Sequence, residues 1–163
     1  MKTLLILRHA KSSWNNSRLT DHERPLNDRG RRDAPRMGRH LRDESLVPDL
    51  IVTSSAERAF ATAELVALAC DYEEDIVVTR DLYHGVPEDY VEALYELGGE
   101  KRVILVVGHN PGIEELVTYL TGEEERMPTA ALAQVTLPID GWRDLGDDTE
   151  GVLENLWLPK TLG

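Results

Sequence analysis

The chain has 163 residues, of which 41% are hydrophobic and 29% charged, which is the balance of a folded domain rather than of a disordered chain. Thirty acidic residues against eighteen basic ones give a net charge of −12, and this sign disfavours binding to nucleic acid or to an anionic membrane. No apolar run approaches the ~18–20 residues of a membrane span, and the run near the N-terminus is too short for a signal peptide, so we expect a single cytoplasmic domain over residues 1–163.

Short apolar runs along the chain predict six β-strands. They are residues 4–7, 50–52, 76–78, 103–107, 133–137 and 152–158. The first four are almost free of polar residues, which is typical of strands that are buried on both faces of a parallel sheet. Turn signals at Asp140-Gly141 and Gly146-Asp147 separate the last two, and we expect that pair to form an antiparallel edge.

Helical stretches separate the strands. The four expected helices begin near Asn27, Ser55, Pro87 and Gly112, with Asn27 and Ser55 as caps. The first runs to about Glu44, although Pro35 should kink or break it, and Gly122 closes the last. The alternation predicts a three-layer α/β/α fold in which helices cover both faces of a mostly parallel sheet.

Charged side chains follow three of these strands. Arg8-His9 comes directly after the first strand, Gly108-His109 after the strongest one, and Arg58 lies about one helical turn after the second. Ligands of open α/β sheets bind beyond the carboxyl ends of the strands, so these segments should meet at one rim. Arginine beside histidine repels a cation and binds phosphoryl oxygens through a planar fork of donors. The pattern therefore favours a phosphoryl group over a metal ion, although each histidine alone is more often structural.

The segment after the strongest strand has a second property. Gly108 to Gly112 delivers backbone N–H groups and a helix N-terminus next to His109, and both favour anions. Taken alone, the same segment is equally well interpreted as a plain strand–turn–helix connector.

Three motifs resemble those of the histidine phosphatase superfamily, which has the phosphoglycerate mutase-like fold. They are Leu7-Arg8-His9-Ala10-Lys11-Ser12-Ser13-Trp14-Asn15, Ser54-Ser55-Ala56-Glu57-Arg58-Ala59-Phe60-Ala61-Thr62-Ala63 and Gly108-His109-Asn110-Pro111. They follow the family's order and span nearly the whole chain. The short length and the segment Arg24-Pro25-Leu26 resemble the SixA-type phosphohistidine phosphatases most. Ala10 stands where the family usually has glycine.

The resemblance implies a reaction that needs no metal and no cofactor. His9 would attack phosphorus and become a phosphohistidine, while Arg8 and Arg58 would neutralise the phosphoryl oxygens. His109 would donate a hydrogen bond to the phosphoryl group and would be useful as a cation. Polar side chains near the phosphate would be Ser12, Asn15 and Asn110.

The general acid has no clear position. Relatives of the mutase type place a glutamate just after the third strand, and the candidates here are Glu88, His84 and Asp21, each equally plausible as an ordinary loop residue. An alkoxide leaving group needs a proton, whereas the imidazole of phosphohistidine needs far less help. A weak or absent acid therefore favours phosphohistidine as the substrate.

We accordingly expect a phosphatase acting on a phosphorylated protein, such as a histidine phosphorelay domain, whose site could also hold phosphate or another oxyanion. One alternative is a phosphatase of small phosphorylated molecules. Another is a non-catalytic module that binds a phosphorylated ligand or takes part in a phosphorelay. The short segment between Tyr83 and Pro87 leaves no room for a lid, so the site should be open and shallow.

Two further features have competing interpretations. Residues 24–42 hold seven arginines, which either pair with carboxylates on the same helix, the interpretation we favour, or form a docking surface for an acidic partner. Cys70 has no basic neighbours and fits buried packing rather than reactivity.

Overall fold

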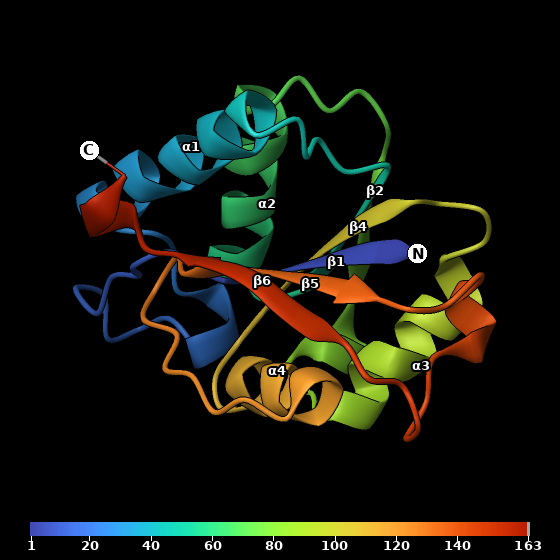
Figure 1. Cartoon of the computed structure of the whole chain (residues 1–163). Coiled ribbons are helices and arrows are strands. Elements are labelled where there is room, and N and C mark those ends of the chain that lie inside the picture. The colour runs from blue at the N-terminus through green and yellow to red at the C-terminus, as the bar shows by residue number, and fades with distance from the viewer. Residues whose placement is uncertain (163) are drawn as a thin grey trace.

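A computed structural model describes residues 1–162, in which six strands form one sheet with helices on both faces (Figure 1). The strands are β1 (Lys2–Arg8), β2 (Leu50–Ser54), β3 (Ile76–Thr79), β4 (Val103–Gly108), β5 (Leu132–Leu137) and β6 (Val152–Trp157). Their order is β3-β2-β4-β1-β5-β6. The first four are parallel, and β5 and β6 add antiparallel pairs at one edge. The predicted α/β architecture is confirmed, the antiparallel edge included.

Two helices cover each face of the sheet. They are α1 (Asp28–Asp43), α2 (Glu57–Ala69), α3 (Pro87–Leu97) and α4 (Gly112–Thr121). Figure 1 shows α1 and α2 on one side and α3 and α4 on the other. No helix within residues 1–162 is both long enough and apolar enough to cross a bilayer.

Successive side chains of the central strands point to opposite faces of the sheet, which produces two separate hydrophobic cores. Leu5 and Leu7 pack with the side chains of α1 and α2, while Leu4 and Ile6 pack with those of α3 and α4. Because both faces are covered, these strands need apolar residues at every position. This explains why the runs in the sequence are continuous rather than alternating.

The first helix begins where it was predicted to begin but continues further than expected. Its start is as predicted, since Asn27 caps α1 by accepting a hydrogen bond from the backbone N–H of Gly30 at 2.9 Å. The expected break at Pro35 is wrong, because α1 continues through it to Asp43. Buried residues on both sides of the proline hold the helix against its neighbours, and packing rather than propensity decides helix stability in a folded chain.

The second helix corrects the predicted cap. Its N-cap is Ala56 rather than Ser55, and the Ser54 hydroxyl accepts from the backbone N–H of Ala56 at 3.2 Å. Ser55 instead bonds the His22 ring at 2.8 Å. At the far end Cys70 is buried, as predicted.

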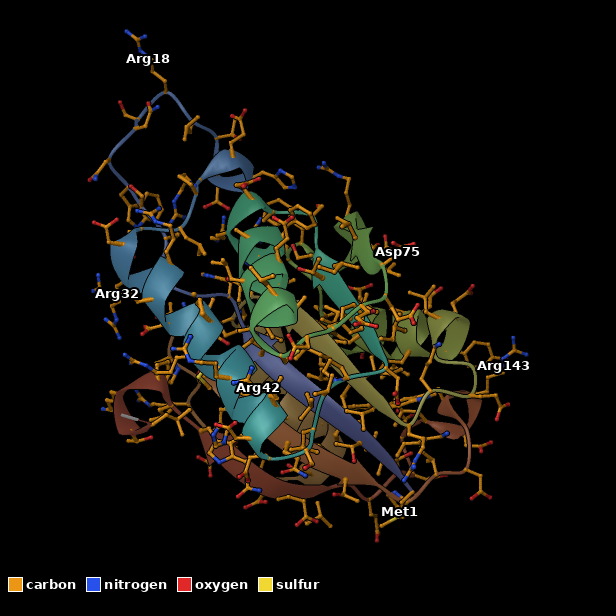
Figure 2. All side chains as sticks on the ribbon, turned by 90° about the horizontal axis from the view of Figure 1, so that it is seen from above. Met1, Arg18, Arg32, Arg42, Asp75 and Arg143 are labelled. Atoms are coloured by element: carbon orange, nitrogen blue, oxygen red, sulfur yellow. The ribbon has the colours of Figure 1, made fainter. Side chains whose placement is uncertain are left out.

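Ion pairs within α1 account for most of the arginine-rich segment. Within this helix, Arg31 pairs with Asp28, Arg29 and Arg36 share Asp33, and Arg42 pairs with Asp43. Figure 2 shows Arg32 on the outer side of the helix. The pairing interpretation is therefore confirmed for these residues. Arg24 precedes the helix and is buried elsewhere.

Close approach between α1 and α2 generates a stability prediction. A Cβ atom on Gly38 would lie 2.6 Å from the Val66 carbonyl oxygen and 2.7 Å from the Ala69 Cβ. Glycine to alanine in a helix usually stabilises by ~0.5–1 kcal/mol, but here overpacking reverses the sign. We predict that Gly38→Ala lowers the free energy of unfolding by about 1–3 kcal/mol in a urea titration.

Gly146→Ala is the matched control, because a Cβ there meets nothing within 4 Å. It should change the free energy of unfolding by less than about 0.5 kcal/mol. Equal stability of the Gly38→Ala protein and the parent would contradict the packing argument.

Candidate active site

The carboxyl ends of three neighbouring strands bring the predicted residues together. In the sheet, β4 lies between β1 and β2, so His109 after β4 sits between His9 after β1 and Ser54 at the end of β2. The two histidine rings are 5.1 Å apart between centroids, and the His109 Nε2 lies 2.8 Å from the Ser54 hydroxyl. The expectation that these distant segments meet at one rim is confirmed.

A small pocket of about 240 Å³ opens at this rim. It is lined by Arg8, His9, Lys11, Ser12, Trp14, Arg24, Arg58, His84, His109, Asn110 and Thr129. Cationic side chains and histidines dominate, and this lining contains no carboxylate. A larger hollow of about 660 Å³ beside α4 has four glutamates in its wall and repels anions. The smaller pocket is therefore the one that suits a phosphoryl group.

The His9 ring is held in one tautomer. Its Nδ1 lies 2.8 Å from the carbonyl oxygen of Ala10, which can only accept, so Nδ1 carries the proton and Nε2 keeps its lone pair. Burial lowers the pKa of His9 to about 4, and Arg58, Arg8 and Arg24 add to the effect against the opposing Ala10 bond. His9 is therefore neutral near pH 7.

Ala10 fits without strain in the place of the usual glycine. Its φ is not among the positive values of residues 1–162, and its N–H donates to the Thr62 hydroxyl at 2.9 Å. The Thr62 hydroxyl in turn donates to the Arg58 carbonyl. This chain of bonds ties the turn after β1 to the first turn of α2.

Ser54 fixes the second histidine. Its hydroxyl accepts from the Ala56 N–H, and the hydroxyl proton is available to the His109 Nε2 at 2.8 Å. In that arrangement the neutral His109 carries its own proton on Nδ1, which is buried without a protein partner.

The protonation state of His109 depends on whether an anion is bound. Burial, followed by His9, Arg58 and His84, lowers the pKa of His109 to about 3, with Asp21 opposing the shift. In the anion-free site His109 is therefore neutral rather than cationic. A bound anion would raise that pKa.

Two of the arginines that line the pocket are held in fixed positions by backbone carbonyls. Arg8 donates from Nη1 to the Met127 carbonyl at 3.1 Å and leaves its Nε without a protein partner. Burial lowers its pKa, with Glu114 opposing. Arg58 is buried at the start of α2 and donates to the Asp21 carbonyl at 2.7 Å.

Asp21 ties the arginines together. Its carboxylate accepts from Arg24 at 2.7 Å, from Arg58 at 3.0 Å and from the Tyr83 hydroxyl at 2.7 Å. Burial raises the pKa of Asp21, but the bonds from Tyr83, Arg24 and Arg58 outweigh that effect and hold it well below its usual range. The carboxyl is ionised near neutral pH, which disfavours the predicted role of Asp21 as a general acid.

The remaining candidates divide between the pocket and the surface. Ser12, Asn110 and His84 line the pocket, as the sequence predicts. Asn15 and Glu88 are exposed and lie outside the lining, so the structure does not bring them to the pocket as predicted. The Asn15 N–H bonds the Ser13 hydroxyl at 3.1 Å in a turn of the loop, and Glu88 occupies the exposed first turn of α3.

Several residues at the site were not selected from the sequence. Lys11, Trp14, Arg24 and Thr129 also line the pocket, and Ser54 contacts His109. Lys11 and Trp14 belong to the first motif, so their place next to His9 was an available signal. Arg24 belongs to the segment Arg24-Pro25-Leu26 that resembles the SixA type, but it was grouped with the arginine-rich residues 24–42 and given no role at the site.

Comparisons with known proteins agree with this geometry. A sequence profile of the histidine phosphatase superfamily (branch 1) matches residues 4–83. An uncharacterized protein of Mycobacterium tuberculosis (strain CDC 1551 / Oshkosh) is 30% identical over 151 residues, covering 85% of this chain and 91% of the relative.

Two solved structures cover almost the whole chain. A SixA protein from Agrobacterium tumefaciens, named for phosphohistidine phosphatase activity, matches with a TM-score of 0.82 and 26% identity over 97% of this chain and 98% of that one. The protein histidine phosphatase SixA complexed with tungstate matches with a TM-score of 0.83 and 24% identity over 99% of each chain. At that identity the second likeness concerns the fold alone.

The buried histidines generate a pH prediction. Unfolded histidine titrates near pH ~6.5, whereas the pKa of His9 is about 4 and that of His109 about 3 in the folded protein. Between these values the unfolded chain binds more protons, so stability falls as the pH is lowered. Each histidine contributes about 2 kcal/mol to this change, so we predict that the free energy of unfolding drops by about 3.5–4 kcal/mol between about pH 7 and about pH 5, measured by urea denaturation.

A His9→Asn, His109→Gln double variant should lose most of this drop, and His40→Asn should keep it. The lower limit of about pH 5 stays above the range in which unfolded aspartate takes up protons, near ~3.9, so the Asp21 contacts do not interfere. Identical pH dependence of the parent and the double variant would contradict the assignment.

Proposed function

The chain belongs to the histidine phosphatase superfamily, and we propose that it is a phosphatase that removes the phosphoryl group from phosphohistidine on a protein. The observation that carries the proposal is the tautomer of His9, whose Nε2 keeps a lone pair in a pocket walled by Arg8, Arg24 and Arg58. A neutral imidazole among guanidinium groups is suited to attack an anionic phosphoryl group.

The first step transfers the phosphoryl group to His9. The Nε2 lone pair forms a bond to phosphorus while the bond between phosphorus and the substrate imidazole breaks. The departing ring keeps that electron pair and, with a proton on its second nitrogen, leaves as neutral imidazole. The proton on Nδ1 of His9 stays there and is donated to the Ala10 carbonyl. In the second step water attacks phosphorus, Nε2 recovers its lone pair, and inorganic phosphate leaves with the oxygen and both protons of the water.

Fixed donors stabilise the charge that spreads over the phosphoryl oxygens. The Arg8 Nε and the His109 Nδ1 are buried without protein partners in two residues that line the pocket, and in the proposed reaction they donate to oxygens of the transferred group. Burial without a partner costs ~1–3 kcal/mol per group, and an anion that accepts from both groups regains that free energy when it binds. Preorganised donors of this kind supply much of the rate in phosphoryl transfer. The proposed reaction uses no metal and no cofactor, since these side chains carry the positive charge.

The missing carboxylate supports the substrate class. The pocket lining holds no aspartate or glutamate, and the carboxylate of Asp21 is ionised and occupied by two arginines. His84 is the remaining candidate donor at the pocket. An alkoxide leaving group would therefore depart with little help, whereas imidazole is a far better leaving group. Two solved relatives are named for acting on phosphohistidine, which points the same way.

The small volume of the pocket indicates which kind of substrate it can accept. Its volume of about 240 Å³ is below the ~300–1,000 Å³ of pockets that enclose a small ligand. His84 is exposed at its edge, so a side chain that projects from a protein can reach His9. We accordingly propose a phosphorylated protein as substrate, in a single-domain enzyme of the cytoplasm whose site also takes phosphate or another oxyanion. A small phosphoester is the alternative substrate.

His9→Ala tests the nucleophile. We predict that this variant folds, loses turnover by many orders of magnitude and no longer acquires a phosphoryl label, because no other lone pair replaces Nε2. The measurement is radiolabelled phosphoryl transfer with an alkaline quench, which preserves a phosphohistidine. His40→Ala is the control, since His40 packs on Trp157 outside the pocket. Normal labelling of a folded His9→Ala protein would sink the mechanism.

The need for a general acid distinguishes phosphohistidine from small phosphoesters as the substrate, and His84 is the residue to test. We predict that His84→Gln lowers kcat/KM on phosphohistidine by much less than the ~100-fold loss expected for an essential general acid, and lowers it more on a sugar phosphate. Glu88→Gln, a carboxylate outside the pocket, should leave both values within about twofold. A large and equal loss on both substrates for His84→Gln would reveal a dedicated acid and move the assignment to small phosphoesters.

A further inference from the structure

We propose that Trp14 forms an aromatic platform at the phosphoryl pocket, on which a flat leaving group such as the imidazole of phosphohistidine stacks. The inference deepens the proposed function and rests on it, because it concerns the group that departs from phosphorus. It assigns a specificity-determining role to a side chain whose size and exposure the transfer of the phosphoryl group does not explain.

The indole is large, exposed and part of the pocket wall. Trp14 is 74% exposed, an unusual state for the largest side chain, and it lines the same pocket as His9. The guanidinium carbon of Arg24 lies 3.3 Å from the ring centroid, so one face of the indole is covered. The exposed area therefore belongs mainly to the opposite face.

Arg24 holds the platform in place. The guanidinium is itself only 7% exposed. It donates from Nε to the Ser13 carbonyl at 3.1 Å, from Nη1 to the Asp21 carboxylate at 2.7 Å and from Nη2 to the Ser12 hydroxyl. A ring that rests on a cation with three fixed contacts loses little further entropy when a ligand stacks on it.

The rest of the pocket offers little for an apolar leaving group. The lining beside Trp14 consists of arginine, lysine, histidine and short polar side chains. The His84 ring is already paired with Tyr83 at 4.1 Å between centroids. Trp14 is thus the main apolar surface in the described lining. A flat ring gains stacking energy there, while ammonia or a small alkoxide gains none.

The position of Arg24 makes this ring relevant to the reacting atoms. Trp14, Arg24 and His9 line the same pocket of about 240 Å³, and Arg24 lies against the indole. In a pocket of this size, a substrate that places its phosphoryl group against His9 has its leaving ring within reach of the indole. Trp14 lies on the loop between β1 and α1, which extends beyond the body of the molecule, with Arg18 at its tip (Figure 2).

A simpler role would be that Trp14 only shields Arg24 from water, and the two roles predict different losses. A shield acts on the phosphoryl site, so its removal weakens every substrate and inorganic phosphate alike. A platform acts on the leaving group, so its removal weakens only substrates that carry a flat ring. Trp14→Leu keeps an apolar cover over Arg24 and removes the aromatic face, while Trp14→Phe keeps a smaller ring.

The experiment compares two substrates with the same type of scissile bond. Phosphohistidine releases an imidazole, and phosphoramidate releases ammonia. We expect Trp14→Leu to lower kcat/KM on phosphohistidine by about 5- to 20-fold and to change kcat/KM on phosphoramidate, and inhibition by inorganic phosphate, by less than about twofold. Trp14→Phe should recover most of the loss.

Equal losses on both substrates, together with weaker inhibition by phosphate, would assign Trp14 to shielding and overturn the platform. No loss on either substrate would overturn it as well. If the parent enzyme hydrolyses phosphoesters but not phosphohistidine, the proposed function fails separately. The platform is then decided by phenyl phosphate against methyl phosphate, where Trp14→Leu must reduce the first selectively.

Discussion

Three guanidinium groups share one small pocket in a protein of net charge −12, and the rest of the site depends on how their repulsion is balanced. Asp21 bridges Arg24 and Arg58, and the Met127 carbonyl holds Arg8. One carboxylate and a few carbonyl oxygens position three full charges without neutralising them all. The positive charge that is not neutralised is available to a phosphoryl group. Burial lowers the pKa of His9 and this positive charge lowers it further, so His9 stays neutral.

Each contact in this balance comes from a different part of the fold. Gly30 of α1 lies against the backbone of Lys11 with no space for a side chain, which fixes the loop that carries Ser12 and Trp14. The Met127 peptide accepts from Arg8 and Asn110, and its N–H donates to the Glu114 carboxylate at 2.7 Å. The pocket is therefore set by packing between elements rather than by any single motif.

The sequence predicted those parts of the site that follow from the strand ends. His9, His109 and Arg58 lie at or near the carboxyl ends of β1, β4 and β2, and a parallel sheet brings such ends together whatever the side chains. Asp21 and Ser54 could not be assigned in the same way, because their roles depend on contacts 37 and 55 residues away in the chain. The predicted break at Pro35 was wrong for a related reason. Tertiary packing holds this helix together, and local helix propensity carries no information about that packing.

Burial is the largest cause of the low pKa values of the two histidines, and the positive charge that gives the pocket its affinity for anions lowers them further. Arg58 disfavours a proton on both rings in the empty site, and a phosphoryl group neutralises that field when it binds. By linkage, an anion that raises the pKa of His109 must bind more tightly when His109 carries a proton. Nδ1 of His9 is bonded to Ala10 and its Nε2 faces the incoming phosphorus, so the added positive charge falls on His109, whose ring centroid lies 5.1 Å from that of His9. The empty site thus holds a neutral nucleophile, and the arrival of substrate itself favours the second charge.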